Sequence, residues 1–370
     1  MQKKLIALAV AGLVSAPAFA QSNVTIYGVA DAYMGFGSHG DNDMAAVNSG
    51  GLSGSRIGFR GTESLGNGLN AVFTYEQGFD IDDTANTDGT NGLGGAARQA
   101  FVGLGGAWGT VSLGRQYAPG YDFQYDAFAS SPILSAQAIL SDYEGLATID
   151  AGSGSRWNNS VAYNGSFSGL KVRAIYAMGG EENSYAVGDK LMDPSDDDRF
   201  GLGVEYANGP LKVGAVYHYL SDPASITGTD DQQEWLVGGS YNFGVLTLAG
   251  SYQEIDSAYN VKGIDADIWQ VGVVVPVGAA GNVHVGYGEL DIDANAMGET
   301  FSGKAKSYSI AYTHALSKRT TAYAGYNRTD NDNGLDAGPV AYLPSAGDVA
   351  AGRFGGDESD VFAVGVRHTF

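Results

Sequence analysis

The chain has 370 residues, with 41 Asp and Glu against 20 Lys and Arg, and its formal net charge is −21. This excess of acid argues against nucleic acid as a partner, and the absence of cysteine excludes a disulfide scaffold and thiolate chemistry. No stretch after the first twenty residues is apolar for long enough to cross a membrane as a helix. The strands of a membrane β-barrel give no such signal, because they alternate and their average hydropathy is neutral.

The N-terminus has the order of a Sec signal peptide. Lys3 and Lys4 precede an apolar run over residues 5–14, and AFA at 18–20 follows as a small-x-small cleavage site. The apolar run is too short to span a bilayer, and the alternative is an anchoring or buried helix. We therefore predict a signal peptide over residues 1–20. Loss of the two lysines would change the net charge from −21 to −23.

After this segment the sequence alternates between apolar and polar residues, which is the period of a β-strand. In RFGLGVEY the apolar face holds Phe200, Leu202, Val204 and Tyr206, and the polar face holds Arg199, Gly201, Gly203 and Glu205. GLKVRAIYA (169–177), NVHVGYG (282–288) and DVFAVGVRHTF (360–370) divide in the same way. RWNNSVAY (156–163) places Trp157 on the apolar face. Lysines and arginines within these strands lie on the polar face.

Sixteen strands are predicted in chain order. They lie near residues 23–36, 54–63, 68–78, 96–105, 109–116, 155–164, 169–178, 199–207, 210–220, 233–243, 245–256, 265–277, 281–291, 305–316, 319–329 and 360–370. Short turns such as SLGNG and LSKR alternate with long connections, of which 117–154 and 330–359 are the longest. This parity places all long loops at one end of an up-and-down barrel. An even strand number also lets the first strand pair with the last, which leaves no unpaired edge in lipid.

A soluble β-sandwich would also alternate, with its apolar face in a core. Two features favour a membrane barrel. The polar face is rich in glycine, and tyrosine and tryptophan lie near strand ends, as aromatic girdles do at lipid headgroups. An arginine facing lipid would cost about 2–4 kcal/mol at the bilayer midplane, so the basic residues must face a lumen. We predict that residues 21–370 form an all-β, sixteen-stranded antiparallel transmembrane barrel with acidic long loops.

Several segments resemble the general porins of Gram-negative outer membranes. They are VTIYGVADAY (24–33), SRIGFRGTESLGNGLNAVFTYEQGF (55–79), RQAFVGL (98–104), GTVSLGRQY (109–117) and the terminal Phe370. The resemblance implies a homotrimer in the outer membrane, next to lipopolysaccharide and lipid. Each barrel would hold a water-filled pore for passive diffusion of small hydrophilic solutes and ions. It also implies that the third long loop, from residue 117 to about 154, folds inward and narrows the pore.

The same resemblance implies that arginines on the barrel wall face acids on that loop. The wall candidates are Arg56, Arg98, Arg115 and Arg156, with Glu76 as an acidic partner, and Arg60, Lys171 and Arg173 share the lumen parity. Simple alternation places Arg115 on the outer face, so its role requires a twist or bulge. The loop candidates are Asp122, Asp126, Asp142 and Glu144. The alternative for each basic residue is a solvated lumen charge with no special role.

The chain ends on a phenylalanine inside a strand, and the resemblance implies that Phe370 is an assembly signal. No G-x-S-x-G elbow or P-loop is present, and the five histidines show no metal-ligand spacing. We predict that the chain is not an enzyme and needs no cofactor, and surface divalent cations at the acidic loops remain a hypothesis. Two other functions stay open: a substrate-selective channel, and a structural or adhesive barrel with a blocked lumen.

Overall fold

The structure is a computed structural model, and it describes residues 23–39, 42–82, 97–179, 197–221, 229–296, 299–332 and 358–370. The expected signal peptide, residues 1–20, lies outside these ranges, and within them the side chain of Glu144 is not described. No helix in the described ranges is long and apolar enough to cross a membrane.

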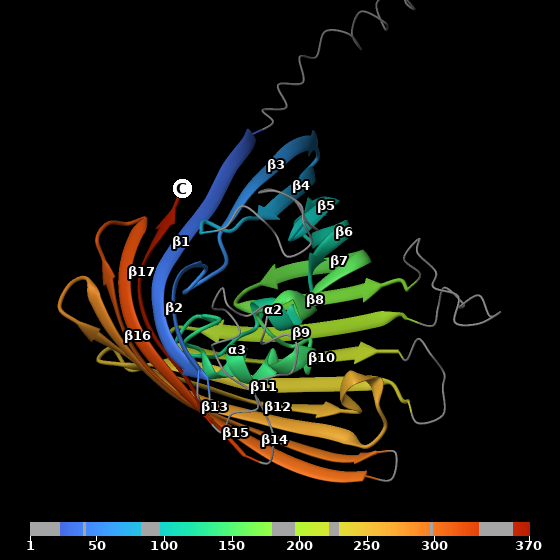
Figure 1. Cartoon of the computed structure of the whole chain (residues 1–370). Helices are drawn as coiled ribbons and strands as arrows, with labels where there is room; N and C mark the ends of the chain where they lie inside the picture. Colours follow the sequence, from blue (N-terminus) through green and yellow to red (C-terminus); the bar gives the residue numbers. More distant parts are fainter. Residues whose placement is uncertain are drawn as a thin grey trace, which may run out of the picture.

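The described residues form seventeen strands in one sheet (Figure 1). The strands are β1 (Asn23–His39), β2 (Asn42–Ser49), β3 (Arg56–Gly66), β4 (Leu69–Gly78), β5 (Gln99–Gly106), β6 (Gly109–Tyr117), β7 (Arg156–Phe167), β8 (Leu170–Ala177), β9 (Arg199–Asn208), β10 (Leu211–Leu220), β11 (Gln232–Asn242), β12 (Thr247–Asp256), β13 (Ile264–Val277), β14 (Gly281–Ala296), β15 (Glu299–Ala315), β16 (Thr320–Asn331) and β17 (Glu358–Thr369). Each is antiparallel to its neighbours, and each of the sixteen predicted strands overlaps one of them.

The sheet closes on itself because β1 pairs with β17, from Val29 opposite Thr369 to His39 opposite Ser359. On its other edge β1 pairs with β2 through Ala32–His39 and with β3 through Asn23–Val29. Strands β2 and β3 are therefore two halves of one wall position, and the seventeen strands make the sixteen-stranded closed barrel that was predicted. The sequence analysis missed β2, because it ended the first strand at residue 36.

Alternation along the strands separates two faces as predicted. On β17 the side chains of Phe362, Val364 and Val366 are 45–48% exposed, whereas Val361 and Ala363 are 0% exposed. On β9 the same division leaves Phe200, Leu202, Val204 and Tyr206 exposed and covers the residues between them. The apolar face therefore surrounds the outside of the barrel, which excludes a β-sandwich with an apolar core between two sheets.

The prediction for Trp157 is wrong. Its side chain is 1% exposed, and its ring lies 4.8 Å from that of His218, beside Ala118 and Ile175. The register between β6 and β7 shifts by one residue between Gly114 and Gln116, and Asn159 has φ of 47°. This bulge reverses the parity of the residues that precede it on β7, so a tryptophan expected in lipid turns to the inside.

Residues 118–155 connect β6 to β7 and contain short helices instead of strands. They are α2 (Pro119–Asp122), α3 (Ala136–Ser141), η1 (Tyr143–Gly145) and η2 (Ser153–Ser155); a further turn, η3 (Ala258–Asn260), follows β12. Figure 1 shows α2 and α3 within the ring of strands. Ser135 caps α3, because its side chain accepts a hydrogen bond from the N–H of Ala138.

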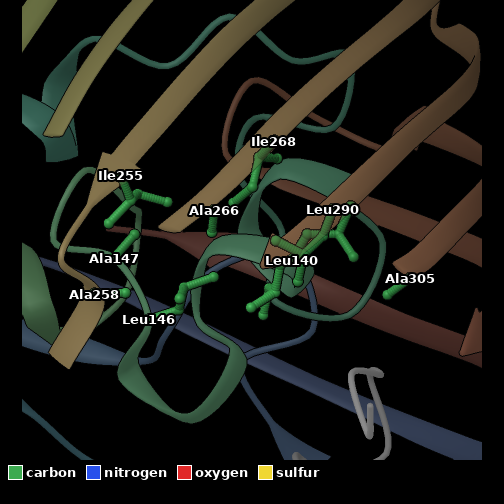
Figure 2. Close-up of a cluster of buried hydrophobic side chains, with 10 residues drawn as sticks. Leu140, Leu146, Ala147, Ile255, Ala258, Ala266, Ile268, Leu290 and Ala305 are labelled. Atoms are coloured by element: carbon green, nitrogen blue, oxygen red, sulfur yellow. The ribbon is translucent and has the colours of Figure 1, made fainter. Parts of the chain in front are cut away.

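Four apolar clusters join this segment to the covered face of the barrel, and the two largest lie against β12–β17 and β1. In Figure 2, Leu140, Leu146 and Ala147 of the segment pack against β12–β15. The barrel side of this cluster consists of Ile255, Ala258, Ala266, Ile268, Leu290, Ile292 and Ala305. A second cluster packs Phe128, Ile133 and Leu134 against residues of β1 and β15–β17. Leu134, Leu140 and Leu146 are each 0% exposed, and burial of each stabilises the segment by about 1.5–3 kcal/mol.

Deletion of Phe370 should reduce the amount of folded, heat-modifiable protein in the outer membrane. The backbone of Phe370 exchanges two hydrogen bonds with Gly28, each 3.1 Å long, and its ring covers Gly28. Heat-modifiability on gels measures the folded fraction. Phe370→Ala is the control, because it keeps the backbone pair and removes only the ring. A normal folded level for the deletion would contradict a role of Phe370 in assembly.

Candidate functional site

The buried carboxylate of Glu76 binds several side chains on the inside of the barrel. Glu76, on β4, is 3% exposed. Its Oε1 lies 2.9 Å from Nε of Arg98 and accepts a hydrogen bond of 2.8 Å from the Tyr117 hydroxyl. Its Oε2 accepts from the Tyr27 hydroxyl at 3.0 Å and lies 3.7 Å from Nε of Arg56. Two of the predicted wall arginines therefore meet at the acidic partner that the sequence analysis named.

Two tyrosines extend this cluster towards the segment that follows β6. The rings of Tyr117 and Tyr121 stack with centroids 3.7 Å apart and an angle of 2° between their planes. Nη2 of Arg98 donates to both hydroxyls at 3.1 Å. The guanidinium of Arg156 lies over both rings, 5.5 and 5.6 Å from their centroids, which is the geometry of a cation–π contact. Arg56, Arg98 and Arg156 thus gather around one stacked pair.

The tyrosine at the end of this stack reports the local potential. Burial alone would raise the pKa of Tyr121, but the charges of Arg98, Arg56 and Arg156 and a hydrogen bond with Tyr117 outweigh it. The pKa of Tyr121 is therefore lowered from its ordinary value. A phenol becomes more acidic where positive charge stabilises its anion, so the potential at this hydroxyl is positive.

The other predicted basic residues lie along the wall. Arg60 lies over the Tyr27 ring, 5.0 Å from its centroid. Lys171 forms an ion pair of 3.3 Å with Glu205. Arg173 forms an ion pair with Asp122 and donates from Nη2 to the carbonyl of Tyr117 at 2.5 Å. The structure thus joins one predicted wall residue, Arg173, directly to one predicted loop acid.

Arg115 takes a different direction from the other three wall arginines. Its Nε donates to the Ala97 carbonyl at 2.5 Å, and its Nη1 donates to Oδ1 of the exposed Asn158 at 2.6 Å. A register shift does lie beside it, between Gly114 and Gln116. In the contacts described, however, Arg115 binds this neighbouring backbone and side chain rather than Glu76.

The predicted loop acids differ in where their carboxylates point. Asp126 accepts hydrogen bonds from the N–H groups of Phe128 and Ser130 in its own turn, and burial raises its pKa. Asp122 and Asp142 line a cavity of about 480 Å³ that is also lined by Arg98, Arg156 and Tyr121. Two of the loop acids and two of the wall arginines therefore line the same cavity.

Sequence analysis did not single out three further residues of this region. Tyr117 and Tyr121 form the stack, and Arg367 on β17 is close enough to Asp31 and Arg56 for its charge to interact with theirs. Arg367 lies on the polar face of its strand, so its parity was a usable signal. Tyr121 gave none, because it lies beyond the last alternating residue of β6.

A buried hydrogen-bond network joins the segment over residues 118–155 to β10 and β11. Glu234, on β11, is 0% exposed and accepts hydrogen bonds from the N–H groups of Thr148 and Ile149 at 2.8–3.0 Å. Nε2 of His218 accepts the N–H of Gly120 at 3.1 Å. Its other nitrogen, Nδ1, lies 2.9 Å from Oγ1 of Thr148 and therefore carries the proton.

The described residues contain no group of three or more His, Cys, Asp or Glu side chains arranged to hold a metal ion. The acidic segments DNDM (41–44) and DPSDDDR (193–199) lie partly outside the described ranges.

A closed antiparallel barrel with an apolar outer face and charged residues inside defines a membrane channel of the outer-membrane type. A family model of Gram-negative porins matches residues 7–334. The chain is 33% identical to outer membrane porin protein 32 of Delftia acidovorans and 29% identical to an outer membrane porin protein of Bordetella pertussis, in both cases over the full length of both chains. An anion-selective porin from Comamonas acidovorans has a similar solved structure, with a TM-score of 0.73 and 26% identity over 94% of this chain and 100% of that one.

The chain therefore belongs to the Gram-negative porin family. It is an outer-membrane porin channel, as the sequence analysis predicted from its motifs.

The cation-to-anion permeability ratio should increase as pH rises, with an onset below the ordinary phenol pKa of about 10. Ionisation of Tyr121 places a negative charge among Arg56, Arg98 and Arg156, and the lowered pKa of Tyr121 brings this step to lower pH. Reversal potentials in a salt gradient, measured from about pH 7 to about pH 10.5, should show the step. Tyr121→Phe should lack it. An identical profile in both proteins would contradict this assignment of the charge.

Glu234→Ala should loosen the segment over residues 118–155. It leaves the N–H groups of Thr148 and Ile149 buried without an acceptor, at about 1–3 kcal/mol each. We expect a lower temperature of heat-modification and more frequent current fluctuations in single channels. Glu234→Gln keeps one carbonyl acceptor and should show a smaller change. Equal stability of all three proteins would show that this network does not hold the segment.

Proposed function

We propose that the protein is a water-filled channel for the passive diffusion of small hydrophilic solutes and ions, narrowed by residues 118–155. A cavity of about 480 Å³ that is lined by Arg98 and Arg156 and, from this segment, by Asp122 and Asp142 supports the proposal. The two largest apolar clusters and the Glu234 network support a fixed position of the segment.

We also propose that the functional unit is a homotrimer that contacts lipopolysaccharide and lipid through its exposed apolar face. The support is membership of the porin family together with the ring of exposed apolar side chains on the barrel. Export through a signal peptide over residues 1–20 fits an outer-membrane location.

Selectivity of the channel is proposed to favour anions more than its net charge suggests. The formal net charge is −21, but charges at a wide mouth are screened beyond about 8–10 Å. Ions in the narrow section meet Arg56, Arg98 and Arg156, with Glu76 as the counter-charge at the wall. The similar solved structure of an anion-selective porin supports the same direction.

Replacement of Arg56 and Arg98 together by serine should raise the cation-to-anion permeability ratio. Loss of two charges at the narrow section changes the energy of a monovalent ion by on the order of one to two kT, with opposite sign for cations and anions, so the ratio changes by a factor of about seven to fifty. Reversal potentials in a planar bilayer measure it. Lys318→Ser with Arg319→Ser is the control, because it removes the same charge from an exposed turn between β15 and β16.

Glu76 loses both ion-pair partners in the first variant, so its folded level must be measured as well. Arg156→Gln leaves Glu76 paired and should shift the ratio in the same direction by a smaller amount. An equal shift of the permeability ratio in the Arg56→Ser, Arg98→Ser protein and in the Lys318→Ser, Arg319→Ser protein would contradict the proposal. A complete lack of conductance would instead favour a structural barrel with a blocked lumen.

A further inference from the structure

Residues 50–55, between β2 and β3, form an extra turn that does not fit into the sheet. The pairing of β1 with β2 ends at Ser49, and its pairing with β3 begins at Arg56. Only two residues of β1, one of them Asp31, lie opposite the six residues in between. The surplus has no partners in the ladder and must leave the plane of the sheet. Residues 50–55 are called the inner turn below.

The inner turn points into the barrel, because it contacts the segment over residues 118–155. Oγ of Ser131, which is 0% exposed, donates a hydrogen bond of 2.6 Å to the carbonyl of Gly51. Leu52 packs against the apolar cluster that contains Phe128 of the same segment. Both contacts place the inner turn inside the ring of strands, where it reduces the open cross-section in addition to that segment.

Asp31 holds the inner turn with its side chain and with its backbone. It lies on β1 and is 0% exposed. Its Oδ2 accepts hydrogen bonds from the N–H groups of Leu52 at 2.8 Å and Ser53 at 2.9 Å, and its Oδ1 accepts one from the Tyr323 hydroxyl at 2.7 Å. Its N–H donates to Oγ of Ser55 at 3.0 Å, and that hydroxyl donates to its carbonyl at 3.1 Å. One carboxylate therefore connects the inner turn to β1 and β16.

The inner turn lies against two of the wall arginines. The carbonyl of Gly54 accepts a hydrogen bond of 2.8 Å from Nη1 of Arg56. Gly54 also lines the same cavity as Arg98, and a β-carbon at Gly54 would lie 3.3 Å from Nη1 of Arg98. The ion pair between Arg56 and Glu76 is longer, with 3.7 Å between Nε and Oε2. The direction of the Arg56 guanidinium therefore depends on where Gly54 is held.

We propose that Asp31 is a positioning residue for the selectivity of the channel. It holds the inner turn, and the inner turn sets the direction of Arg56 and the width of the passage beside it. This inference rests on the proposed function, because it requires that ions pass beside Arg56. It goes beyond that function, since it makes a buried acid a support of anion preference through contacts that do not involve the ion.

The sign of the change in selectivity distinguishes positioning from charge. Loss of a negative charge inside the barrel can by itself only lower the cation-to-anion permeability ratio or leave it unchanged. Release of the inner turn raises the ratio, because Arg56 is then no longer held at the narrow section. Asp31→Ala removes both the charge and the acceptor for the N–H groups of Leu52 and Ser53. Asp31→Asn removes the same charge and keeps a carbonyl oxygen as acceptor.

Reversal potentials and single-channel conductance of the full protein in planar bilayers test the proposal. Asp31→Ala should raise the cation-to-anion permeability ratio by a factor of about two to seven, as expected for one displaced charge. It should also raise the conductance, because the inner turn is released. Asp31→Asn should raise neither quantity. The folded level of both variants is measured by heat-modifiability on gels.

A second test does not depend on a substitution of Asp31. The chain contains no cysteine, so Gly54→Cys carries a single thiol on the inner turn, and a sulfonate reagent specific for thiols adds a negative charge there. We expect the reagent to lower the current and to raise the permeability ratio. Lys318→Cys, in the exposed turn between β15 and β16, is the control and should respond much less.

The outcomes separate this inference from the proposed function. Equal ratios in Asp31→Ala and Asp31→Asn would show that only the charge of Asp31 acts, and they overturn the positioning role. If Asp31→Ala does not fold, an unchanged current after treatment of Gly54→Cys overturns the inference, and a lower current supports it. If the unmodified protein conducts no ions, the proposed function itself fails.

Discussion

Every backbone N–H and C=O group within lipid must be paired inside the protein, and the rest of this structure depends on that constraint. A sheet satisfies it only by closing, so the first strand has to meet the last. Here β1 pairs with β17 over eleven residue pairs, Val29–Thr369 to His39–Ser359, and Phe370 extends the pairing to Gly28. Closure also fixes the direction of every side chain, because alternate residues then face lipid or the inside without exception other than a bulge.

Closure of sixteen wall positions leaves an interior too wide for the wall side chains alone to fill. The segment over residues 118–155 fills part of it with the two largest apolar clusters, which lie against β12–β17 and β1. The Glu234 and His218 hydrogen bonds fix the same segment to β10 and β11. These contacts fix the segment against β10–β17. The passage that we propose for solutes lies on the side of Arg56, Arg98 and Arg156.

The alternation of apolar and polar residues was sufficient to predict most of the barrel from the sequence, because it is present within each strand of the wall. It placed Phe362 and Val364 outside and Glu205 inside, and the count of alternating segments gave sixteen strands. It failed where one residue changes the parity. The bulge at Asn159 turned Trp157 inward, and the interruption at residues 50–55 divided one wall position into β2 and β3. Such interruptions depend on how a strand pairs with its neighbours, so the residue pattern of one strand does not reveal them.

The candidate site was less predictable because it is assembled from distant segments. Motif resemblance located Glu76, Arg56 and Arg98, whose strands are neighbours in both sequence and space. It could not rank the loop acids, because their roles depend on how the loop folds: Asp126 accepts hydrogen bonds within its own turn, whereas Asp142 faces the cavity. The role of Arg115 stays a prediction, and its guanidinium binds a neighbouring backbone carbonyl. Burial, Asp142 and Glu234 raise the pKa of Asp150 well above its usual range. Net charge and residue count therefore describe the inside of this barrel poorly, since a few charges, such as those of Arg56 and Arg98 beside Glu76, are held at fixed positions.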